Sequence, residues 1–449
     1  MMELSGKKIS VIGAARSGIG AAKLVKKKGG IPFVSDIGRN EKLKDSINIL
    51  KEEKIEFETG VHSEKLYDCD FMIVSPGVPF DSEIIRNARS KKIKMISEVE
   101  LAYRFCKGKI IAITGTNGKT TTTSLCGHVF NNSGKKAYVA GNIGLAFSEI
   151  VTDVRENDFV VLEVSSFQLD LIEKFKPSVA VILNITPDHL NRYENSVEKY
   201  AFSKQRIYEN QDENDFLVVN GDDETTLKFL KGYKSKSFLF SLSKEQKNGC
   251  YFDDGTVINK KDNKENFSCS VDDIAIKGEH NIANAMAVII TAKIFDLNND
   301  KIKTAMKSFK GVEHRLEFVR EIGGVRFVND SKATNVDSVW YALRSFNEPI
   351  FLILGGQDKG NEYEKIKQLV IDKVKKIYAI GSSAEKVFNF FHSFIKVEIK
   401  NSMEEIATAA LSEARKGDVV LLSPACASFD MFDNYEHRGR VFKNAVNNL

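Results

Sequence analysis

The chain has 449 residues, of which 42% are hydrophobic and 28% are charged, and its formal net charge is +4. This composition is typical of a globular protein and excludes a disordered or fibrous one. Lysines are spread along the whole chain, so no concentrated basic block indicates binding to nucleic acid. The length predicts two or three domains. The weak, evenly spread positive charge predicts small anionic ligands.

The six cysteines form no CxxC pair and no metal-finger spacing, which predicts unpaired thiols in a reducing cytosol. The stretch "MMELSGKKISVIG" leads directly into a strand, and no apolar run reaches about 18 residues. We expect a cytoplasmic protein with neither a signal peptide nor a membrane span.

The first segment opens with a strand, a glycine turn, a helix and a second strand that ends at Asp36. Gly13, Ala15 and Gly18 stand at the three glycine positions of the dinucleotide fingerprint, so the middle glycine is missing. The turn still predicts a diphosphate at the helix N-terminus, with a purely structural turn as the alternative. "CDFMIVSPGVPFD" places Gly77 after another apolar strand, where ligands lie in open parallel sheets.

The stretch "ITGTNGKTTTT" predicts a phosphate-binding loop between a strand and a helix. Ile113 stands where the Walker A rule requires its first glycine, so the strict motif fails. Gly115 and Gly118 still allow backbone N–H groups to converge on phosphate oxygens. Lys119 would supply a positive charge and Thr120 a hydroxyl for Mg²⁺.

Two continuous apolar runs follow, "FVVLEVSS" and "VAVILNIT", as expected of parallel strands buried on both faces. Glu163 ends the first run and is a plausible Mg²⁺ ligand, with a helix-capping or surface role as the alternative. His189 in "NITPDHLNRY" and Lys204 in "EKYAFSKQRIY" have no assigned role by pattern alone, and Lys204 is typical of an exposed helix lysine. Residues 245–275 read as a surface elaboration with short β-like pieces, followed by a helix in "GEHNIANAMAVIITAKIF".

The third segment contains four predicted strands, in "RFVNDSKATN", "IFLILGG", "IYAIG" and "VVLLSPACASFD". The fold class is therefore α/β, with three consecutive domains: a Rossmann-like first and third domain around a P-loop ATPase-like central domain. The predicted boundaries are 1–98, 99–311 and 312–449.

Three classes of function compete for this layout. A nicotinamide oxidoreductase would use the first glycine turn, but its fingerprint is broken. A P-loop switch needs loops that sense the nucleotide, but not a third α/β domain. An ATP-consuming ligase needs one domain for an anionic substrate, one for ATP and one for the nucleophile, so it fits the layout best.

Several motifs together resemble the Mur ligases, and among them the branch that adds D-glutamate. They are "TGTNGKTTT", "GNIG", "LEVSSFQLD", "NITPDHLNRY", "GEHNIANA", "VEHRLE", "NDSKATN", "LILGGQDKG" and "SPACASFDMFDNYEHRGRVF". The resemblance covers nearly the whole chain in order. The phosphate loop and "HNIANA" would suit any Mur ligase or a folylpolyglutamate synthase, whereas "NDSKATN" and "SPACASFDMF" indicate the D-glutamate-adding branch.

The resemblance implies an ATP-dependent ligase of cytoplasmic peptidoglycan synthesis, and hence of cell wall formation, cell shape and cell division. ATP would phosphorylate the L-alanyl carboxylate of UDP-N-acetylmuramoyl-L-alanine, and the amine of D-glutamate would attack the acyl phosphate. The resemblance implies a monomer whose partners are these small molecules, without nucleic acid or membrane.

The resemblance also implies site residues. Catalytic roles fall on Lys119, Asn142, Glu163, His189 and Lys204. ATP would contact Gly115, Thr116, Asn117, Gly118, Lys119, Thr120, Thr121, Asn284, Arg315 and Asp330. The UDP-muropeptide would contact Arg16, Ser17, Asp36, Gly77, Asn142, Ser165 and His189. D-Glutamate would contact Lys332, Thr334, Lys359, Ser428 and Tyr435.

Two Mg²⁺ ions are implied, with ligands from Thr120, Glu163, His189 and Lys204. Lys204 would be carbamylated by CO₂, which turns an ammonium into a carboxylate-like group. The chain departs from the pattern at Ile37 and Gly38, which offer no side-chain donor beside the uracil, and at Tyr435, where phenylalanine is also familiar.

Overall fold

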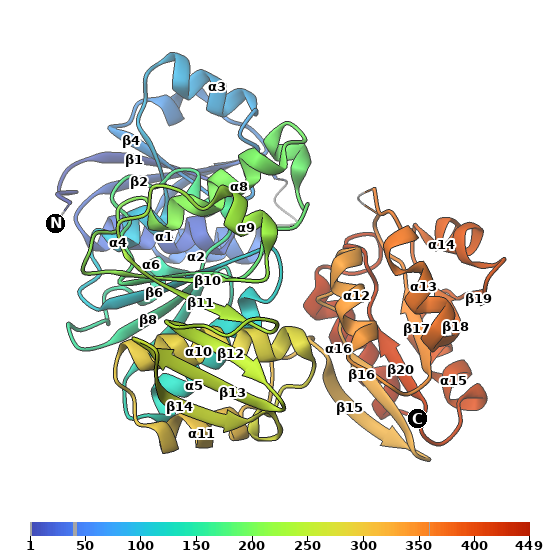
Figure 1. Ribbon diagram of the computed structural model, residues 1–449. Helices are drawn as coiled ribbons and strands as arrows, with labels where there is room; N and C mark the ends of the chain where they lie inside the picture. The colour runs from blue at the N-terminus through green and yellow to red at the C-terminus, as the bar shows by residue number, and fades with distance from the viewer. Residues whose placement is uncertain (1, 39–42, 359) are drawn as a thin grey trace. The chain divides into compact units, whose positions relative to one another are not determined.

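The computed structural model describes residues 2–38, 43–358 and 360–449, and its fold is α/β, as predicted (Figure 1). The chain divides into two compact units. Unit 1 comprises the described parts of Met1–Ile274 and Ile282–Phe309, and unit 2 those of Ala275–Asn281 and Lys310–Leu449. Unit 1 contains two sheets and unit 2 contains a third. The three domain boundaries drawn from the sequence stay a prediction.

The first sheet of unit 1 is parallel, with strand order β3-β2-β1-β4-β5. Its strands are β1 (Lys8–Ile12), β2 (Ile31–Asp36), β3 (Glu56–Thr59), β4 (Phe71–Val74) and β5 (Met95–Ser97). The helices of this part are α1 (Arg16–Lys27), α2 (Lys44–Glu52), η2 (Glu64–Tyr67), α3 (Glu83–Ser90) and α4 (Glu98–Tyr103). The strand order reverses between β1 and β4, so a ligand crevice is expected at their carboxyl ends.

The second sheet has the order β14-β13-β12-β11-β10-β9-β6-β8-β7. Its strands are β6 (Lys109–Thr114), β7 (Ala137–Gly141), β8 (Phe159–Glu163), β9 (Val179–Ile182), β10 (Phe216–Asn220), β11 (Lys236–Ser241), β12 (Gly249–Asp253), β13 (Thr256–Lys261) and β14 (Lys264–Ser270). Pairing is parallel from β7 to β12 and antiparallel from β12 to β14. β8 and β9 are fully buried apolar runs, as expected for central parallel strands.

Helices accompany this second sheet along the rest of unit 1. They are α5 (Lys119–Asn132), α6 (Phe147–Ile150), α7 (Ser166–Leu169), η3 (Leu190–Tyr193), α8 (Val197–Gln205), η4 (Arg206–Tyr208), α9 (Glu224–Phe229), η5 (Val271–Asp273), α10 (Glu279–Ile294) and α11 (Asn299–Ser308). The first residues of α10 belong to unit 2.

One hydrophobic core joins the two sheets of unit 1. It includes Val11 and Ile73 from the first sheet and Ala112 and Val160 from the second. Helix α1 packs on α6 between them. Gly20 allows this approach, because a Cβ atom there would lie 2.6 Å from Ser148 Oγ. The two sheets of unit 1 are therefore held by shared packing as well as by the chain.

The sheet of unit 2 has the order β15-β16-β20-β17-β18-β19 and is parallel except for the β15–β16 pair. Its strands are β15 (Glu317–Ile322), β16 (Val325–Asn329), β17 (Ile350–Leu354), β18 (Val374–Ala379), β19 (Lys396–Ile399) and β20 (Val419–Leu422). Its helices are α12 (Val336–Arg344), α13 (Glu364–Lys373), α14 (Ala384–Phe391), α15 (Met403–Glu413) and α16 (Tyr435–Asn447). Buried side chains pack on both faces of this sheet.

Two expectations about elements are wrong. Residues 245–275 are not a surface elaboration, since β12, β13 and β14 extend the second sheet and bury Cys250, Val257 and Phe267. The third segment has two strands, β15 and β19, beyond the four expected from its apolar runs. No helix among the described residues is long and apolar enough to cross a membrane.

Candidate active site

The predicted phosphate loop joins β6 to α5 in unit 1. Gly118 precedes the helix with a φ of +84°, and a Cβ atom there would lie 2.5 Å from Asn284 Oδ1. The amide of Asn184 shapes the loop: Asn117 N–H donates to Asn184 Oδ1 (2.8 Å), and Asn184 Nδ2 donates to Asn117 O (3.1 Å). Glycine is therefore required at position 118 for two reasons: a side chain would clash with Asn284, and the positive φ is strained for other residues. The structure brings Asn284, a predicted ATP residue, against the loop.

Two lysines meet at one carbonyl of this loop. Lys119 Nζ donates to Gly115 O (2.8 Å) and Thr116 O (2.7 Å), and Lys204 Nζ also donates to Gly115 O (2.9 Å). Lys204 is only 1% exposed, so the pattern-based interpretation as an exposed helix lysine is wrong. Burial, and then repulsion from Lys119, lowers the pKa of Lys204 well below its usual range. Burial thus shifts the balance of the unmodified side chain toward the neutral amine.

Glu163 provides the carboxylate beside the loop. It ends β8, next to β6 in the sheet, and its side chain is buried. Oε1 accepts a hydrogen bond from Asn142 Nδ2 (2.9 Å), whereas Oε2 has no hydrogen-bond partner among the described residues. A buried carboxylate oxygen without a donor suits a hard cation such as Mg²⁺. Thr120, the second residue of α5, is also buried and carries a hydroxyl.

His189 lines a cavity of about 600 Å³ in unit 1. Its φ is +51°, its ring packs edge-on against Phe167 with 5.2 Å between centroids, and Nε2 lies 3.6 Å from Asp188 Oδ2. The same cavity is lined by Gly77 from the first sheet. Ser165, another predicted muropeptide residue, caps α7, which contains Phe167. The structure thus brings three of the predicted muropeptide segments together.

A larger cavity of about 770 Å³ lies at the carboxyl ends of β1, β2 and β4. All four residues predicted for the uridine diphosphate line it: Arg16, Ser17, Asp36 and Gly77. Asp36 accepts hydrogen bonds from Ala14 N (2.6 Å) and Gly38 N (2.7 Å). Its carboxylate therefore fixes the glycine turn that borders the cavity.

The remaining predicted residues lie in unit 2. Asp330 is 1% exposed, accepts a hydrogen bond from Ser423 Oγ (2.9 Å), and lies 3.9 Å from Arg315 Nη1. Burial raises the pKa of Asp330 to about 6, against the opposing effect of Arg315. The two predicted ATP residues of this unit are thus an ion pair. Lys359, predicted for D-glutamate, lies outside the described residues.

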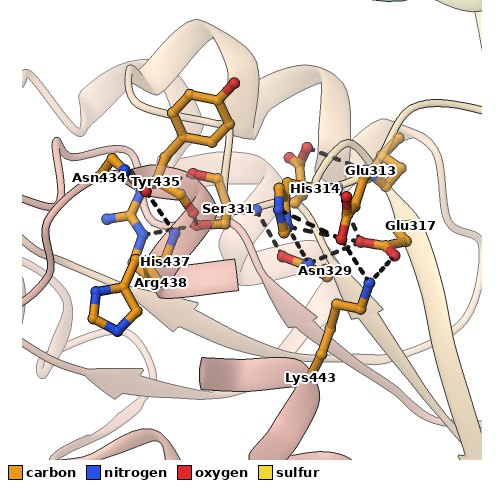
Figure 2. Close-up of polar contacts among 12 residues, drawn as sticks. Glu313, His314, Glu317, Asn329, Ser331, Asn434, Tyr435, His437, Arg438 and Lys443 are labelled. Carbon is orange, nitrogen blue, oxygen red and sulfur yellow. Dashed lines mark hydrogen bonds and ion pairs between the residues drawn. The ribbon is translucent and has the colours of Figure 1, made fainter. Parts of the chain in front are cut away.

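A buried arginine joins the loops predicted to hold D-glutamate (Figure 2). Arg438 donates from Nε to Ser331 Oγ (2.9 Å), from Nη2 to Ser331 O (2.7 Å) and from Nη1 to Cys426 O (3.1 Å). Ser331 precedes Lys332, whose ammonium lies 5.2 Å from the centroid of the Tyr435 ring. The segment around Cys426 leads to buried Ser428. Arg438 thus binds the segments next to Lys332 and Ser428, Lys332 contacts Tyr435, and Thr334 follows Lys332 on the same loop.

Next to it, Glu313, His314 and Glu317 offer atoms within 4.8 Å of one another, a spacing that a metal could use (Figure 2). Lys443 Nζ, however, donates to both Glu313 Oε1 (3.0 Å) and Glu317 Oε1 (2.6 Å). Its ammonium thus forms an ion pair with both carboxylates. The group is therefore an ion-pair network that fixes the turn carrying Arg315.

Pattern reasoning missed several residues of these sites. Asn184, Arg192, Tyr200 and Arg438 are polar side chains that bind backbone or loop atoms, and His62 lines the larger cavity. Asn184 could have been found, because it directly follows an apolar strand. The other roles depend on contacts between segments far apart in the sequence.

Comparison with known proteins gives matches along the whole chain. Three family models match: a MurD N-terminal domain at residues 8–84, a Mur ligase middle domain at 113–292, and a Mur ligase, glutamate ligase domain at 314–426. A UDP-N-acetylmuramoylalanine–D-glutamate ligase of Chloroherpeton thalassium is 44% identical, over 100% of this chain and 99% of its own. One of Thermoanaerobacter sp. is 44% identical, over 100% of both chains.

A solved structure shares the fold. The crystal structure of UDP-N-acetylmuramate-alanine ligase from Thermotoga maritima matches with a TM-score of 0.65 and 21% identity, covering 98% of this chain and 99% of that one.

Proposed function

This chain belongs to the Mur ligase family, and we propose that it joins D-glutamate to UDP-N-acetylmuramoyl-L-alanine while ATP is converted to ADP and phosphate. The observation that carries the proposal is the full-length similarity to enzymes named for this reaction. The product would be an intermediate of peptidoglycan synthesis, and we place the enzyme in the cytoplasm as a monomer.

The reaction has two chemical steps. The L-alanyl carboxylate attacks the γ-phosphorus of ATP, which breaks the bond to ADP and forms an acyl phosphate. The D-glutamate amine then attacks the acyl carbon. The tetrahedral adduct expels inorganic phosphate, the amine loses a proton, and an amide remains.

The phosphate loop would hold ATP through the backbone N–H groups at the start of α5 and through Lys119. The Lys119 ammonium donates hydrogen bonds to the carbonyls of Gly115 and Thr116, so it already lies over the loop. Arg315 and Asp330 would contribute the ATP contacts of unit 2. Asn284, which packs against Gly118, would keep the loop in its open-turn conformation.

Thr120 and Glu163 would hold one Mg²⁺, and His189 with Lys204 a second. A bound Mg²⁺ supplies positive charge that offsets the charge developing on the transferred phosphoryl group. Asn142 would keep the Glu163 carboxylate oriented toward the loop through its 2.9 Å hydrogen bond. The unmodified amine of Lys204 is a poor ligand for this cation, which prefers oxygen.

We therefore propose that Lys204 is carbamylated in the active enzyme. Its neutral amine, favoured by burial, attacks CO₂ and releases a proton, which leaves an N-carboxylate. The N-carboxylate is negatively charged and would attract the Lys119 ammonium, whereas a protonated Lys204 would repel it. The modification would give the second Mg²⁺ the oxygen ligand that His189 lacks.

The two cavities and the unit 2 loops would each bind a different substrate or part of a substrate. Arg16, Ser17, Asp36 and Gly77 would bind the uridine diphosphate in the 770 Å³ cavity. Asn142, Ser165 and His189 would meet the muropeptide near its reacting carboxyl. Lys332, Thr334, Lys359, Ser428 and Tyr435 would bind D-glutamate. We keep the three proposed domains, 1–98, 99–311 and 312–449, as the bodies that carry these roles.

The test is release of phosphate by the purified protein with ATP, Mg²⁺ and UDP-N-acetylmuramoyl-L-alanine. We expect release with D-glutamate, and none above background with L-lysine, meso-diaminopimelate or D-alanyl-D-alanine. Release with L-lysine alone would move the protein to another Mur ligase activity. Release with a folate and L-glutamate would move it to the folylpolyglutamate synthases.

A further inference from the structure

Arg192 is a largely buried arginine that the proposed chemistry does not use. It lies in η3, three residues after His189, and its side chain is 13% exposed. Nη1 donates to Pro76 O (2.9 Å) and Val78 O (3.1 Å), two carbonyls of the loop that follows β4. Arg192, which lies in a connection between strands of the second sheet, thus holds a loop of the first sheet.

The two carbonyls flank Gly77. In a trans peptide the C=O and the following N–H point in opposite directions. Because Pro76 O faces Arg192, the N–H of Gly77 is turned away from it. Gly77 lines both cavities, whereas Arg192 lines the smaller one and not the larger. Arg192 therefore holds the Gly77 peptide in one orientation.

The same guanidinium reaches the other muropeptide segments. It lies over the ring of Phe167, 4.0 Å from the centroid, and Nε lies 3.8 Å from Asp170 Oδ2. Phe167 belongs to α7, which Ser165 caps, and its ring packs on His189. Arg192 thus touches the segments of Gly77 and Ser165, and the aromatic ring behind His189.

We propose that Arg192 is a positioning residue that links the nucleotide cavity to the reacting end of the site. It fixes the loop at residues 75–79 so that Gly77 faces the nucleotide-sugar, and it braces Phe167 behind His189. The inference rests on the proposed function, since it takes a nucleotide-linked acid as the substrate.

The geometry requires an arginine. A planar guanidinium can donate to two carbonyls and stack on an aromatic ring at the same time, whereas a lysine ammonium is a point charge on a flexible stem. Both carbonyls accept from the single nitrogen Nη1, and the stacking of the planar group on Phe167 holds that nitrogen in place. Lysine at this position would keep the charge, but it would lose the stacking and with it the fixed position of the donor. Hydrogen bonds from a charged donor are the stronger ones, so their loss should be measurable in binding.

The experiment measures binding of UDP-N-acetylmuramoyl-L-alanine by calorimetry, without ATP or D-glutamate, to the wild type, Arg192→Lys and Arg192→Ala. We expect Kd to rise about tenfold to a hundredfold in both variants, with Kd for ATP within about twofold of the wild type. Hydrogen exchange should speed up in the loop at 75–79 and stay unchanged at 115–122. Methylguanidinium should partly restore binding to Arg192→Ala.

Arg206→Ala is the matched control. Arg206 also donates to backbone carbonyls, those of Asp170 and Ile172, and among the described residues no hydrogen bond or ion pair joins it to the loop at 75–79. Its variant should bind the nucleotide-sugar like the wild type. Equal Kd values for the wild type and Arg192→Lys, or an equal loss in Arg206→Ala, would overturn the inference.

A different result would refute the proposed function without affecting the inference on Arg192: the wild type would bind the nucleotide-sugar but release no phosphate with D-glutamate. If Arg192→Ala is too unstable to purify, Arg192→Lys alone decides, because it fills a similar volume.

Discussion

Lys204 shows how far a single side chain can depart from the environment that its sequence pattern suggests. It is buried, and its amine reaches the carbonyl of Gly115 in the phosphate loop. We expect Lys204→Ala to lose ligation while still binding ATP, and Lys204→Arg not to restore it, since a guanidinium stays positive and takes up no CO₂. Phosphate release and ATP binding measure the two effects.

Acetate offers a control for the Lys204 variants. A small carboxylate at high concentration should partly restore ligation to Lys204→Ala by occupying the vacated oxygen position, and should do nothing for Lys204→Arg. Wild-type ligation by Lys204→Ala would refute the carbamate. A mass of unmodified lysine in the active, metal-loaded enzyme would refute it as well.

Asp330 gives a pH prediction, because burial raises its pKa to about 6 in the folded state. An unfolded aspartate titrates near pH 4, so the folded protein holds this proton more tightly. The stability associated with that proton is complete below about pH 4 and is lost as the pH rises through about 6.

Asp330→Asn removes this titration. We expect the variant to be more stable than the wild type at pH 7.5, by up to about 3 kcal/mol, with the difference vanishing near pH 4. Urea unfolding at several pH values without nucleotide measures it. A difference that stays constant with pH would contradict the assignment. The gain in stability should come with weaker ATP binding, since we propose that Asp330 contacts ATP.

At the level of residues, local spacing predicted some site members and not others. The loop between β6 and α5 was predictable because Gly115, Gly118 and Lys119 lie within five residues of one another in the sequence. Arg438 was not predictable, since it binds Ser331 and Cys426, which are 107 and 12 positions away. A side chain whose partners come from distant segments leaves no local pattern to recognise.

At the level of elements, the junction of β6 and α5 requires glycine at position 118, and this requirement can be tested. Gly118→Ala would strain a backbone with φ of +84° and place Cβ 2.5 Å from Asn284 Oδ1. We expect Kd for ATP to rise at least about tenfold, because the loop must move to relieve the contact, while binding of the UDP-muropeptide stays unchanged.

Gly134→Ala is the control at the other end of the same helix. Its φ is +82°, but the nearest atom to a new Cβ is Lys301 Nζ at 3.6 Å, the tip of a flexible side chain. It should cost a similar backbone strain, seen as a lower Tm, and leave ATP binding intact. Equal losses of ATP affinity in both variants would show that strain alone is responsible.

Sequence patterns identified the strands buried on both faces and missed those at the margins. β8, β9, β17 and β20 are apolar along their length, so they were recognisable. β19 was missed because it is a short edge strand with no fully buried residue. Residues 245–275 were expected to hold only short β-like pieces, because β13 and β14 alternate between buried and more exposed positions and this stretch carries Gly, Asn and Asp, which also mark loops.

At the level of the whole molecule, the residues proposed to bind the substrates are divided between the two units. Ser17 belongs to unit 1 and lines the larger cavity, whereas Ser428 belongs to unit 2 and is buried beside the loops joined by Arg438. We expect Ser17→Ala to raise KM for the UDP-muropeptide about three- to tenfold and Ser428→Ala to raise KM for D-glutamate similarly. Steady-state assays that vary one substrate at a time measure both.

The two variants control for each other, because the chemical change is the same and only the unit differs. Each should leave the other substrate's KM within about twofold. A rise in KM for both substrates in either variant would count against the division of roles. The family and the order of the three domains were readable from motifs along the chain, whereas the assignment of residues 275–281 to unit 2 needed the folded contacts.

The antiparallel strands at the end of the nine-stranded sheet have a consequence for association between molecules. An open strand edge can template a strand from another chain. β14 forms one edge of this sheet, begins with exposed Lys264 and Glu265, and pairs with β13 through a register shift near Asn259. Charged ends and an irregular ladder make a poor template. We therefore expect that the β14 edge does not pair with a strand of another molecule, so the protein should resist aggregation through this edge at high concentration.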